Sequence, residues 1–257
     1  MPTMVPKEAL TITILYDNQV GDSRLTNKWG FACLVETRAT QVLFDTGGDA
    51  PTLLANAAIL EKDLTAVDHV VLSHAHGDHT GGLQGLLATA VTPTVHMLAS
   101  FPRAMRQAAV ENAELMEVTG PREIVPGIWT TGEVAGPVAE QALAVETMEG
   151  WVLITGCAHP GVEMMATQAI SVTGGPLALV IGGYHLGDAG RAKIDATIAT
   201  LQDLGVAAVA PTHCTGDRAR AAFAEAYGDA FHAGGAGAVW RLERRRLGAV
   251  DFSDAGE

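Results

Sequence analysis

The stretch VVLSHAHGDHTGGL, residues 70–83, decides the expected fold and chemistry of this 257-residue chain. A short apolar run of strand type ends in a segment in which His74, His76, Asp78 and His79 lie within six positions. Imidazole nitrogens and carboxylate oxygens are the donors that suit Zn²⁺ and similar transition metals. Three histidines and an aspartate directly after a strand therefore predict a metal-binding loop.

The spacing within this loop has a physical reason. Residues two apart in an extended backbone point to the same side, so His74 and His76 can face one metal ion. We expect Gly77 to let the chain turn, so that Asp78 and His79 face back toward a second ion. The alternative is a polar loop whose histidines only form hydrogen bonds, which is a weaker explanation for a cluster than for one histidine.

Two further histidines occur in similar surroundings. His159 (in VLITGCAHPG) and His213 (in AVAPTHCTG) each follow an apolar run and lie beside small residues. Either one alone is as well explained as a hydrogen-bonded loop histidine. Together with the cluster they complete a set for two metal ions. Among the nine histidines, His69, His96 and His232 lack supporting neighbours and receive no role.

Apolar runs alternate along the chain with Ala- and Leu-rich stretches, and Gly, Pro and Asp mark the breaks. Strands are expected over 11–16, 31–36, 41–44, 67–72, 94–98, 128–131, 141–146, 151–155, 177–181, 207–210 and 238–242. Helices are expected over 51–60, 81–90, 102–112, 162–170, 188–204 and 217–227. The composition, 48% apolar and 18% charged, is that of a globular protein. We expect an α/β fold with both parallel and antiparallel strands, in one domain spanning 1–257.

An internal repeat is visible in the same pattern. A shift of 110 positions, with one residue removed before the third segment, superposes 35–37 on 145–147, 42–44 on 152–154, 70–72 on 179–181, and His76 on His185. Matches between apolar strands also arise by chance. A true duplication predicts two similar β-sheet halves, about 1–125 and 126–257, with the active residues at one shared edge.

Charge and hydropathy exclude several classes of partner. The chain has 16 Lys plus Arg against 29 Asp plus Glu, a formal net charge of −13. Binding to a nucleic-acid backbone needs clustered basic side chains, so no nucleic-acid partner is expected. The basic run RLERRR, 241–246, is expected to be a solvated edge. The chain lacks 18 uninterrupted apolar residues and a secretory signal pattern, which predicts a cytoplasmic protein without membrane contact.

The three cysteines, Cys33, Cys157 and Cys214, show no CxxC spacing and are expected to be reduced thiols. Cys157 and Cys214 are close in sequence to His159 and His213, so thiolate ligation is an alternative for them. Packing as small hydrophobic residues is the favoured interpretation.

The sequence resembles the metallo-β-lactamase superfamily of metal-dependent hydrolases, through HAHGDH at 74–79 and FDTG at 44–47. Other segments follow the order seen in one branch, the 7,8-dihydropterin-6-methyl-4-(β-D-ribofuranosyl)-aminobenzene-5′-phosphate synthase-like proteins: LYDN (15–18), WGF (29–31), LFDTG (43–47), TGCAHPG (155–161), IGGYHL (181–186) and PTHCTG (211–216). The resemblance runs from about residue 10 to 242. It implies a four-layer αββα sandwich, with two similar β-sheet halves and helices outside.

The resemblance also implies roles for individual residues. One divalent ion would be bound by His74, His76 and His159, and the other by Asp78, His79 and His213. The ions are expected to be Zn²⁺, with Mn or Fe as alternatives. Asp45 is implied to be a buried group that orients the metal loop, and its alternative is an ordinary turn or helix cap.

One departure from the family matters. Most dinuclear members carry a bridging Asp at a strand end of the second half, where this sequence has Gly182-Gly183-Tyr184-His185. His185 either replaces the missing ligand, or hydrogen-bonds a substrate or leaving group, or is a structural loop residue. Three weaker candidates for lining a substrate pocket, each with packing or a plain turn as the alternative, are Asp17, Asn18 and Tyr184.

The expected activity is hydrolysis by a zinc-activated hydroxide of a phosphoester, phosphotriester, lactone or related ester. Asp78 or His185 would move the proton. One alternative is a condensation like that of the synthase branch, joining a pterin diphosphate to an aminobenzene ribotide with release of diphosphate. Another is a non-hydrolytic metal-binding or redox protein. The partner is expected to be a small molecule, and formation of a homo-oligomer stays open.

Overall fold

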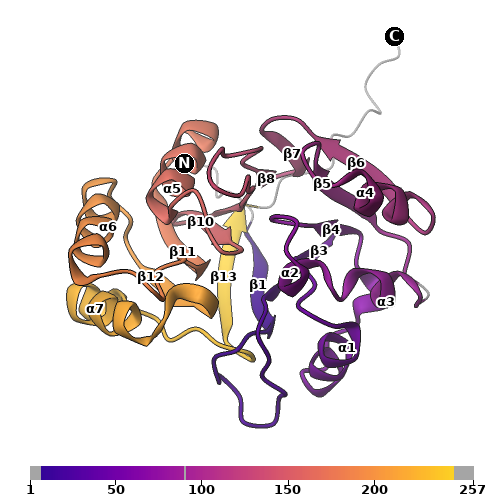
Figure 1. Ribbon diagram of the computed structural model, residues 1–257, viewed down its shortest axis with the longest axis horizontal. Helices are drawn as coiled ribbons and strands as arrows, with labels where there is room; N and C mark the ends of the chain where they lie inside the picture. The colour runs from indigo at the N-terminus through magenta and orange to yellow at the C-terminus, as the bar shows by residue number, and fades with distance from the viewer. Residues whose placement is uncertain (1–6, 90, 246–257) are drawn as a thin grey trace, which may run out of the picture.

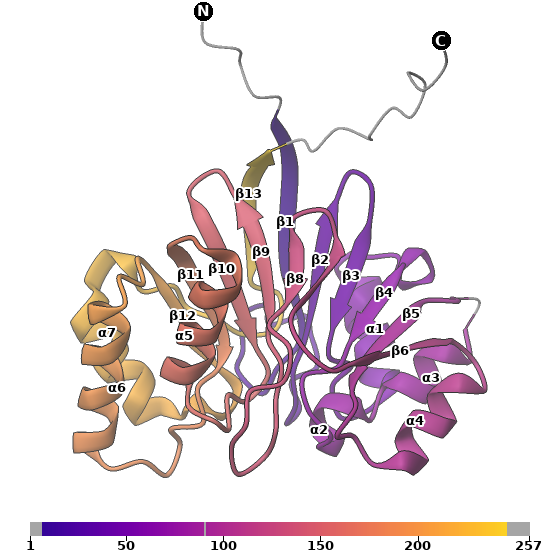
Figure 2. The same cartoon turned by 90° about the horizontal axis from the view of Figure 1, so that it is seen from above.

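A computed structural model describes residues 7–89 and 91–245, in which two β-sheets lie face to face between two layers of helices. The helices are α1 (Ala50–Ile59), α2 (Gly77–Thr80), α3 (Leu83–Leu87), α4 (Arg103–Val110), α5 (Val162–Thr173), α6 (Arg191–Asp203) and α7 (Asp217–Tyr227), with 3₁₀ turns at Leu64–Ala66, His213–Thr215 and Gly228–Ala230. Helices α1 to α4 cover one sheet and α5 to α7 cover the other (Figures 1 and 2). The expected four-layer αββα fold is confirmed.

The first sheet has the strand order β13-β1-β2-β3-β4-β5-β6. Its strands are β1 (Lys7–Tyr16), β2 (Ala32–Thr37), β3 (Gln41–Phe44), β4 (His69–Val71), β5 (Thr94–Leu98), β6 (Glu114–Val118) and β13 (Val239–Arg245). The second sheet has the order β12-β11-β10-β9-β8-β7. Its strands are β7 (Arg122–Val125), β8 (Ile128–Thr130), β9 (Leu143–Thr147), β10 (Gly150–Thr155), β11 (Leu177–Gly183) and β12 (Val209–Thr212). The last strand, β13, thus returns to pair with the first.

The core consists of three apolar layers, because alternate side chains of a strand point to opposite faces of its sheet. On β2, Cys33 and Val35 face the second sheet, whereas Leu34 packs with the helices of its own side. On β10, Ile154 lies between the sheets and Leu153 faces the other helix layer. Both sheets are therefore buried on both faces, which explains the continuous apolar runs in the sequence.

The two sheets contain the same hairpin in the same register. In the antiparallel pair β2–β3, Val35 lies opposite Val42, and in the pair β9–β10, Val145 lies opposite Val152. Both partners are displaced by the 110 positions that relate the two sequence segments. The expected similarity of the two sheet halves therefore extends to the pairing of individual residues.

The next strand corrects the sequence alignment. Val70 lies opposite Leu43 in the first sheet, and Val180 lies opposite Leu153 in the second. The shift of 110 thus continues without a gap, so the removal of one residue was wrong. Apolar side chains fit either register in sequence, whereas the ladder allows only one. The match of His185 with a histidine of the first half depended on that removal.

Several local expectations also need correction. The strands β6 and β7 were not predicted from the sequence. The helix expected over 81–90 is the short α3, and residue 90 lies outside the described residues. Within the basic run, Arg244 is buried, not solvated, and pairs with Glu8 at 3.2 Å, because strand alternation turns it inward. Residue 246 lies outside the described part of the chain.

In the ranges 7–89 and 91–245, no helix has the length and apolar character needed to cross a membrane.

The packing between the sheets makes a testable prediction. Ile12 on β1, which lies between β13 and β2, is fully buried in the inter-sheet layer. We expect Ile12→Ala to lower the free energy of unfolding by about 2–5 kcal/mol, because it leaves a cavity that the two sheets cannot close. Val110→Ala is the control, since this α4 side chain is 59% exposed, and we expect a change within about 0.5 kcal/mol. Urea titration measures both, and equal stabilities would contradict the assigned core.

Candidate metal centre

The predicted metal-binding residues gather at one edge of the sandwich, beyond the ends of strands from both sheets. Four of them follow β4, one follows β10 and one follows β12: His74, His76, Asp78, His79, His159 and His213. Parallel strands deliver the residues at their carboxyl ends to the same edge of a sheet. Since β4 pairs with β3 in parallel, and β11 pairs in parallel with both β10 and β12, the fold brings these distant segments together.

The first loop turns by starting a helix. His76 is the N-cap residue of α2, and Asp78 lies in the first turn of that helix. Gly77 begins this right-handed helix, and an added Cβ there would have nothing within 4 Å. The turn therefore does not depend on glycine at this position, contrary to the sequence-based expectation. Glycine is required a few residues later, where a Cβ on Gly82 would lie 2.1 Å from the carbonyl oxygen of Thr46.

Asp45 lies beneath this loop and is completely buried. Its carboxylate accepts hydrogen bonds from the Ser73 backbone N–H at 2.7 Å, the Ser73 hydroxyl at 2.8 Å and Nδ1 of His79 at 2.7 Å. Burial raises the pKa of Asp45 to about 8, although the contacts with His74 and Ser73 act in the opposite direction. The structure thus places Asp45 where an orienting group for the metal loop should lie.

Glu140 has the same function in the second half, and sequence reasoning missed it. It is completely buried, and its carboxylate accepts hydrogen bonds from the backbone N–H groups of Cys157, Ala158 and His159 and from Nδ1 of His159. Burial alone would raise the pKa of Glu140, but the hydrogen bonds from His159 and the nearby His74 help to lower it to about 2. An ionised carboxylate therefore holds the whole 157–159 turn.

The histidines share one arrangement that suits metal binding. Each of four imidazoles has its Nδ1 within hydrogen-bond distance of an outer partner: His74 with the Ser73 hydroxyl at 2.8 Å, His79 with Asp45 at 2.7 Å, His159 with Glu140 at 3.0 Å and His213 with Asn18 at 2.8 Å. Outer partners of this kind keep the proton of the ring on Nδ1 and leave the lone pair of Nε2 available to a metal ion. The Nε2 atoms of His79 and His213 face Asp78, and that of His74 faces His76.

Two of the buried imidazoles, those of His74 and His79, are also held neutral, as metal ligands must be. Burial lowers the pKa of His74 to about 3 and that of His79 to about 4. The neighbouring His79 and His213, respectively, act in the same direction. Both rings therefore offer a lone pair at neutral pH.

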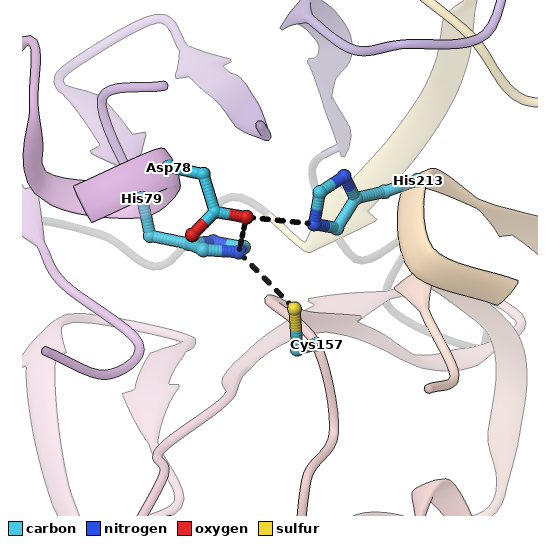
Figure 3. Close-up of side chains that lie close together, drawn as sticks. All are labelled: Asp78, His79, Cys157 and His213. Atoms are coloured by element: carbon cyan, nitrogen blue, oxygen red, sulfur yellow. Dashed lines mark hydrogen bonds and ion pairs between the residues drawn. The ribbon is translucent and has the colours of Figure 1, made fainter. Parts of the chain in front are cut away.

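One group of donors surrounds the side chain of Asp78 (Figure 3). Its Oδ2 lies 3.5 Å from Nε2 of His79 and 3.5 Å from Nε2 of His213, and Nε2 of His79 lies 3.2 Å from Sγ of Cys157. Nitrogen, oxygen and sulfur ligands of one tetrahedral zinc ion are separated by about 3.3–3.6 Å. The spacing of this group therefore fits a single metal ion.

A second group lies beside the first. His74, Cys157 and His159 have donor atoms within 4.8 Å of one another. His76 joins them from the exposed side, with Nδ1 3.1 Å from Nε2 of His74 and its ring centroid 4.9 Å from that of His159. The two groups share the Cys157 thiol.

The clearest sign that a cation fits here is an unsatisfied atom. His213 is 1% exposed, and its Nε2 has no hydrogen-bond partner among the described residues. A buried polar atom without a partner is costly. A metal ion between His213, Asp78 and His79 would satisfy it, so the residues present fit a metal ion at this position.

Backbone strain is concentrated at the same edge. Asp45, Ala158, His185 and His213 all have φ between 49° and 59°, in the left-handed region that residues with a Cβ seldom adopt. Such strain typically accumulates at functional sites, where the surrounding structure holds it in place.

The structure places His185 at the centre but not among its buried donors. Its side chain is exposed, and its ring centroid lies 4.3 Å from that of His159. It shares a third group of donors with Cys157 and Cys214, all within 4.8 Å. A hydrogen bond with Cys214 raises the pKa of His185.

Two of the three weaker candidates do not reach a pocket. Tyr184 is 1% exposed, donates its hydroxyl to the Val180 carbonyl at 2.8 Å and packs in the helix-covered core, so its assignment to substrate was wrong. Asp17 is completely buried and accepts the Thr212 hydroxyl at 2.8 Å, so it supports the strand end from behind. Each residue directly follows a strand, and the sequence does not reveal to which side its side chain turns.

Asn18 does lie at the surface of a cavity of about 490 Å³ beside the centre. The cavity is also lined by Trp29, His185 and His213, and the Trp29 ring centroid is 4.9 Å from that of His213. Trp29 is 60% exposed, which is unusual for so large an apolar side chain. The cavity therefore borders the centre at His213 and His185 and has one aromatic wall.

Comparison with known sequences identifies the family to which the chain is similar. A family model described as the metallo-beta-lactamase superfamily matches residues 30–164. The 7,8-dihydropterin-6-methyl-4-(beta-D-ribofuranosyl)-aminobenzene-5′-phosphate synthase of Methanocaldococcus jannaschii is 30% identical, and the match covers 86% of this chain and 94% of that protein.

Solved structures agree in architecture. Tm1679, described as a metal-dependent hydrolase of the beta-lactamase superfamily, matches with a TM-score of 0.76 and 26% identity, over 90% of this chain and 98% of that one. The metallo-beta-lactamase fold protein YhfI from Bacillus subtilis matches with a TM-score of 0.64 and 15% identity, over 91% and 99%. The second similarity supports the fold alone.

The hydrogen bonds of Glu140 generate a prediction. In Glu140→Gln an NH₂ group faces N–H donors, so the 157–159 turn and the His159 ring lose their alignment. We expect metal affinity to fall by about 10–100-fold, as is typical when an outer partner of a ligand is changed. Glu133→Gln is the matched control, because Glu133 is exposed. Competition with a chromophoric chelator measures both, and equal affinities would show that Glu140 does not orient His159.

Proposed function

Because the chain belongs to the metallo-β-lactamase superfamily, we propose that it is a metal-dependent hydrolase acting on a phosphoester, phosphotriester, lactone or related ester. Members of this superfamily commonly bind divalent metals such as zinc. The observation that supports the proposal best is that the Nε2 atoms of His79 and His213, each ring with its Nδ1 held from outside, both lie 3.5 Å from the carboxylate of Asp78.

We assign the donors to two ions. His74, His76 and His159 would hold the first, and Asp78, His79 and His213 the second. Imidazole and carboxylate donors suit Zn²⁺, with Mn and Fe as alternatives. When bound, divalent cations lower the pKa of water from 15.7 to about 7 and stabilise negative charge that develops on a substrate oxygen.

The chain's own residues supply the rest of the chemistry. Asp78 lies between His79 and His213, where its second oxygen can accept a proton. His185 is exposed at the cavity beside His159, where its imidazole can donate a proton to a leaving group. Asp45 and Glu140 hold the rings of His79 and His159 in place during these proton transfers.

The cavity indicates the kind of substrate. Trp29 presents its indole at the rim, next to the His213 ring. An exposed indole favours stacking with a flat ring or contact with an apolar group. An ester that carries an aromatic or apolar portion therefore fits better than a small ionic one.

A second candidate function is a condensation like that of the synthase from Methanocaldococcus jannaschii, in which a pterin diphosphate would lose diphosphate. It is favoured by the similarity, which covers 94% of that protein, and by the aromatic wall at Trp29. The residues assigned to the two ions would hold them for this reaction as well.

The decisive experiment uses the purified full chain loaded with Zn²⁺. We expect turnover of model phosphoesters, phosphotriesters or lactones without any pterin. Inactivity on all esters combined with pterin binding would replace hydrolysis by the condensation. Iron in the isolated protein with oxygen-dependent turnover would overturn both assignments.

Removal of single ligands makes the next prediction. We expect His76→Ala and His213→Ala each to lose about one metal equivalent and more than about 100-fold in kcat/KM, because changes to outer partners alone cost about 10–100-fold. His232→Ala is the control, since this histidine is exposed and lies outside the donor groups. Metal analysis and ester kinetics give the answer. Full metal content and activity in both ligand variants would show that the site is wrongly assigned.

His185 is expected to behave differently from the ligands. His185→Asn should retain both metal equivalents and lower kcat by about 10²–10⁴-fold, because it removes a proton donor and leaves the buried donors intact. Metal analysis beside steady-state kinetics separates the two roles. Loss of one metal equivalent would make His185 a ligand instead.

A further inference from the structure

One buried amide joins the two halves of the sandwich behind the metal-binding loops. Gln141 lies in the second half, shortly before β9 begins, and its side chain is completely buried. Its Nε2 donates a hydrogen bond to the carbonyl oxygen of Leu72 at 2.8 Å, and its backbone N–H donates to the carbonyl oxygen of Ser73 at 2.9 Å. Both acceptors belong to the first half and directly follow β4. Gln141 thus ties one half to the strand end that leads into the His74 loop.

The orientation of this amide is fixed from its other end. Thr130 on the neighbouring strand β8 donates its hydroxyl to Oε1 of Gln141 at 2.5 Å. The same hydroxyl accepts the backbone N–H of Gly132 at 3.0 Å, so its own proton is left for the amide. A buried amide that is bonded at both ends holds one conformation, because an unpaired end would be costly.

The two sides of this connection lead to two different metal-binding histidines. On the first side, the hydroxyl of Ser73 lies 2.8 Å from Nδ1 of His74. On the second side, Gln141 directly follows Glu140, whose carboxylate accepts hydrogen bonds from the backbone N–H and Nδ1 of His159. His74 and His159 belong to the same donor group, and their ring centroids are 4.6 Å apart. The separation of these two rings therefore depends on the contacts of Gln141.

The main chain of β10 comes close to the same point. A Cβ on Gly156 would lie 2.2 Å from Oγ of Ser73 and 3.0 Å from a carboxylate oxygen of Asp45. Glycine at this position lets the end of β10 approach the first half without a side chain between them. Hydrogen bonds are directional, so those of Gln141 oppose a sliding of one strand end along the other.

The second donor group is connected in another way. Asp78 and His79 are carried by the first half, and His213 is carried by the second. Asn18, which follows β1 in the first half, lies 2.8 Å from Nδ1 of His213 and donates to the His213 carbonyl oxygen at 3.2 Å. This contact crosses between the halves without Gln141. The two donor groups thus depend on different connections.

We propose that Gln141 is a positioning residue for the first metal ion, which sets the distance between His74 and His159 and leaves the ligands of the second ion unaffected. This inference rests on the proposed metal-dependent function, since it concerns how the same centre is built. It adds no ligand and no chemical step. Gln141 supplies the alignment of two imidazoles that come from different sheets.

Two single-site proteins test the inference. In His213→Ala the first ion remains, bound by His74, His76 and His159, and in His76→Ala the second ion remains. Gln141→Met, which keeps the length of the side chain and removes its amide, is introduced into each. Competition with a chromophoric chelator measures the affinity for Zn²⁺. We expect a loss of about 10-fold in the His213→Ala protein, the lower end of the range for outer partners of ligands, and no loss in the His76→Ala protein.

A second measurement needs no metal ion. Proton NMR of the metal-free full chain records the imidazole N–H signals of the buried histidines. Gln141→Met should shift the signals of His74 and His159 and leave that of His213 in place. A chain that binds no metal would remove the proposed function, and this comparison would still decide the role of Gln141.

Two controls separate positioning from stability. Ile12→Ala weakens the core between the sheets away from the centre, so it should leave both affinities and all three imidazole signals unchanged. Thr130→Val removes the hydroxyl that orients the amide. It should change the same quantities as Gln141→Met in the same direction and by a smaller factor, and it replaces Gln141→Met if that variant does not fold.

Three results would overturn the inference. Equal losses of affinity in the two single-site proteins would indicate a general loss of stability. Unchanged affinity in both would show that the first ion does not depend on the amide. Signals of His74 and His159 that stay in place in Gln141→Met would show that the alignment of the two rings has another origin.

Discussion

Two buried carboxylates hold the centre together. An ionisable carboxyl group is expensive to bury unless hydrogen bonds replace its lost hydration. Asp45 accepts three hydrogen bonds and Glu140 accepts four, and these contacts offset the cost in part for Asp45 and fully for Glu140, whose pKa is lowered to about 2. The direction of His79 and His159, and hence the whole donor geometry, depends on these contacts.

The fold determines where the metal-binding loops lie, and the two buried carboxylates determine how their histidine rings are oriented. Two sheets with the same hairpin and the same parallel register end at a common edge, so loops from each half face one another. Left-handed residues at this edge, such as Asp45 and His213, are tolerated because rigid strands lie behind them. Neither half by itself contains a complete set of donors.

Local patterns in the sequence predicted much of the fold and of the candidate metal centre. The metal loop at 74–79, the strand–helix alternation and the role of Asp45 follow from spacing and residue type. Glu140 carries no such signal, because it lies 19 positions before His159 in a stretch without regular pairing, and only the tertiary fold brings them together. Tyr184 failed as a pocket residue because the direction of a side chain at a strand end depends on register. Register is set by the pairing of two strands and cannot be read from one strand alone. For the same reason, the gap placed in the internal repeat was wrong.

The close approach at Gly183 has a consequence for how sequences of this kind can change. The sulfur at position 214 and a side chain at position 183 exclude each other, since a Cβ at 183 would come within 2.7 Å of that sulfur. A Cβ at position 183 would also lie 2.4 Å from the carbonyl oxygen of Gly156, so the main chain as well as the sulfur requires glycine there. Exchange of Cys214 alone would therefore not open this strand end to a side chain.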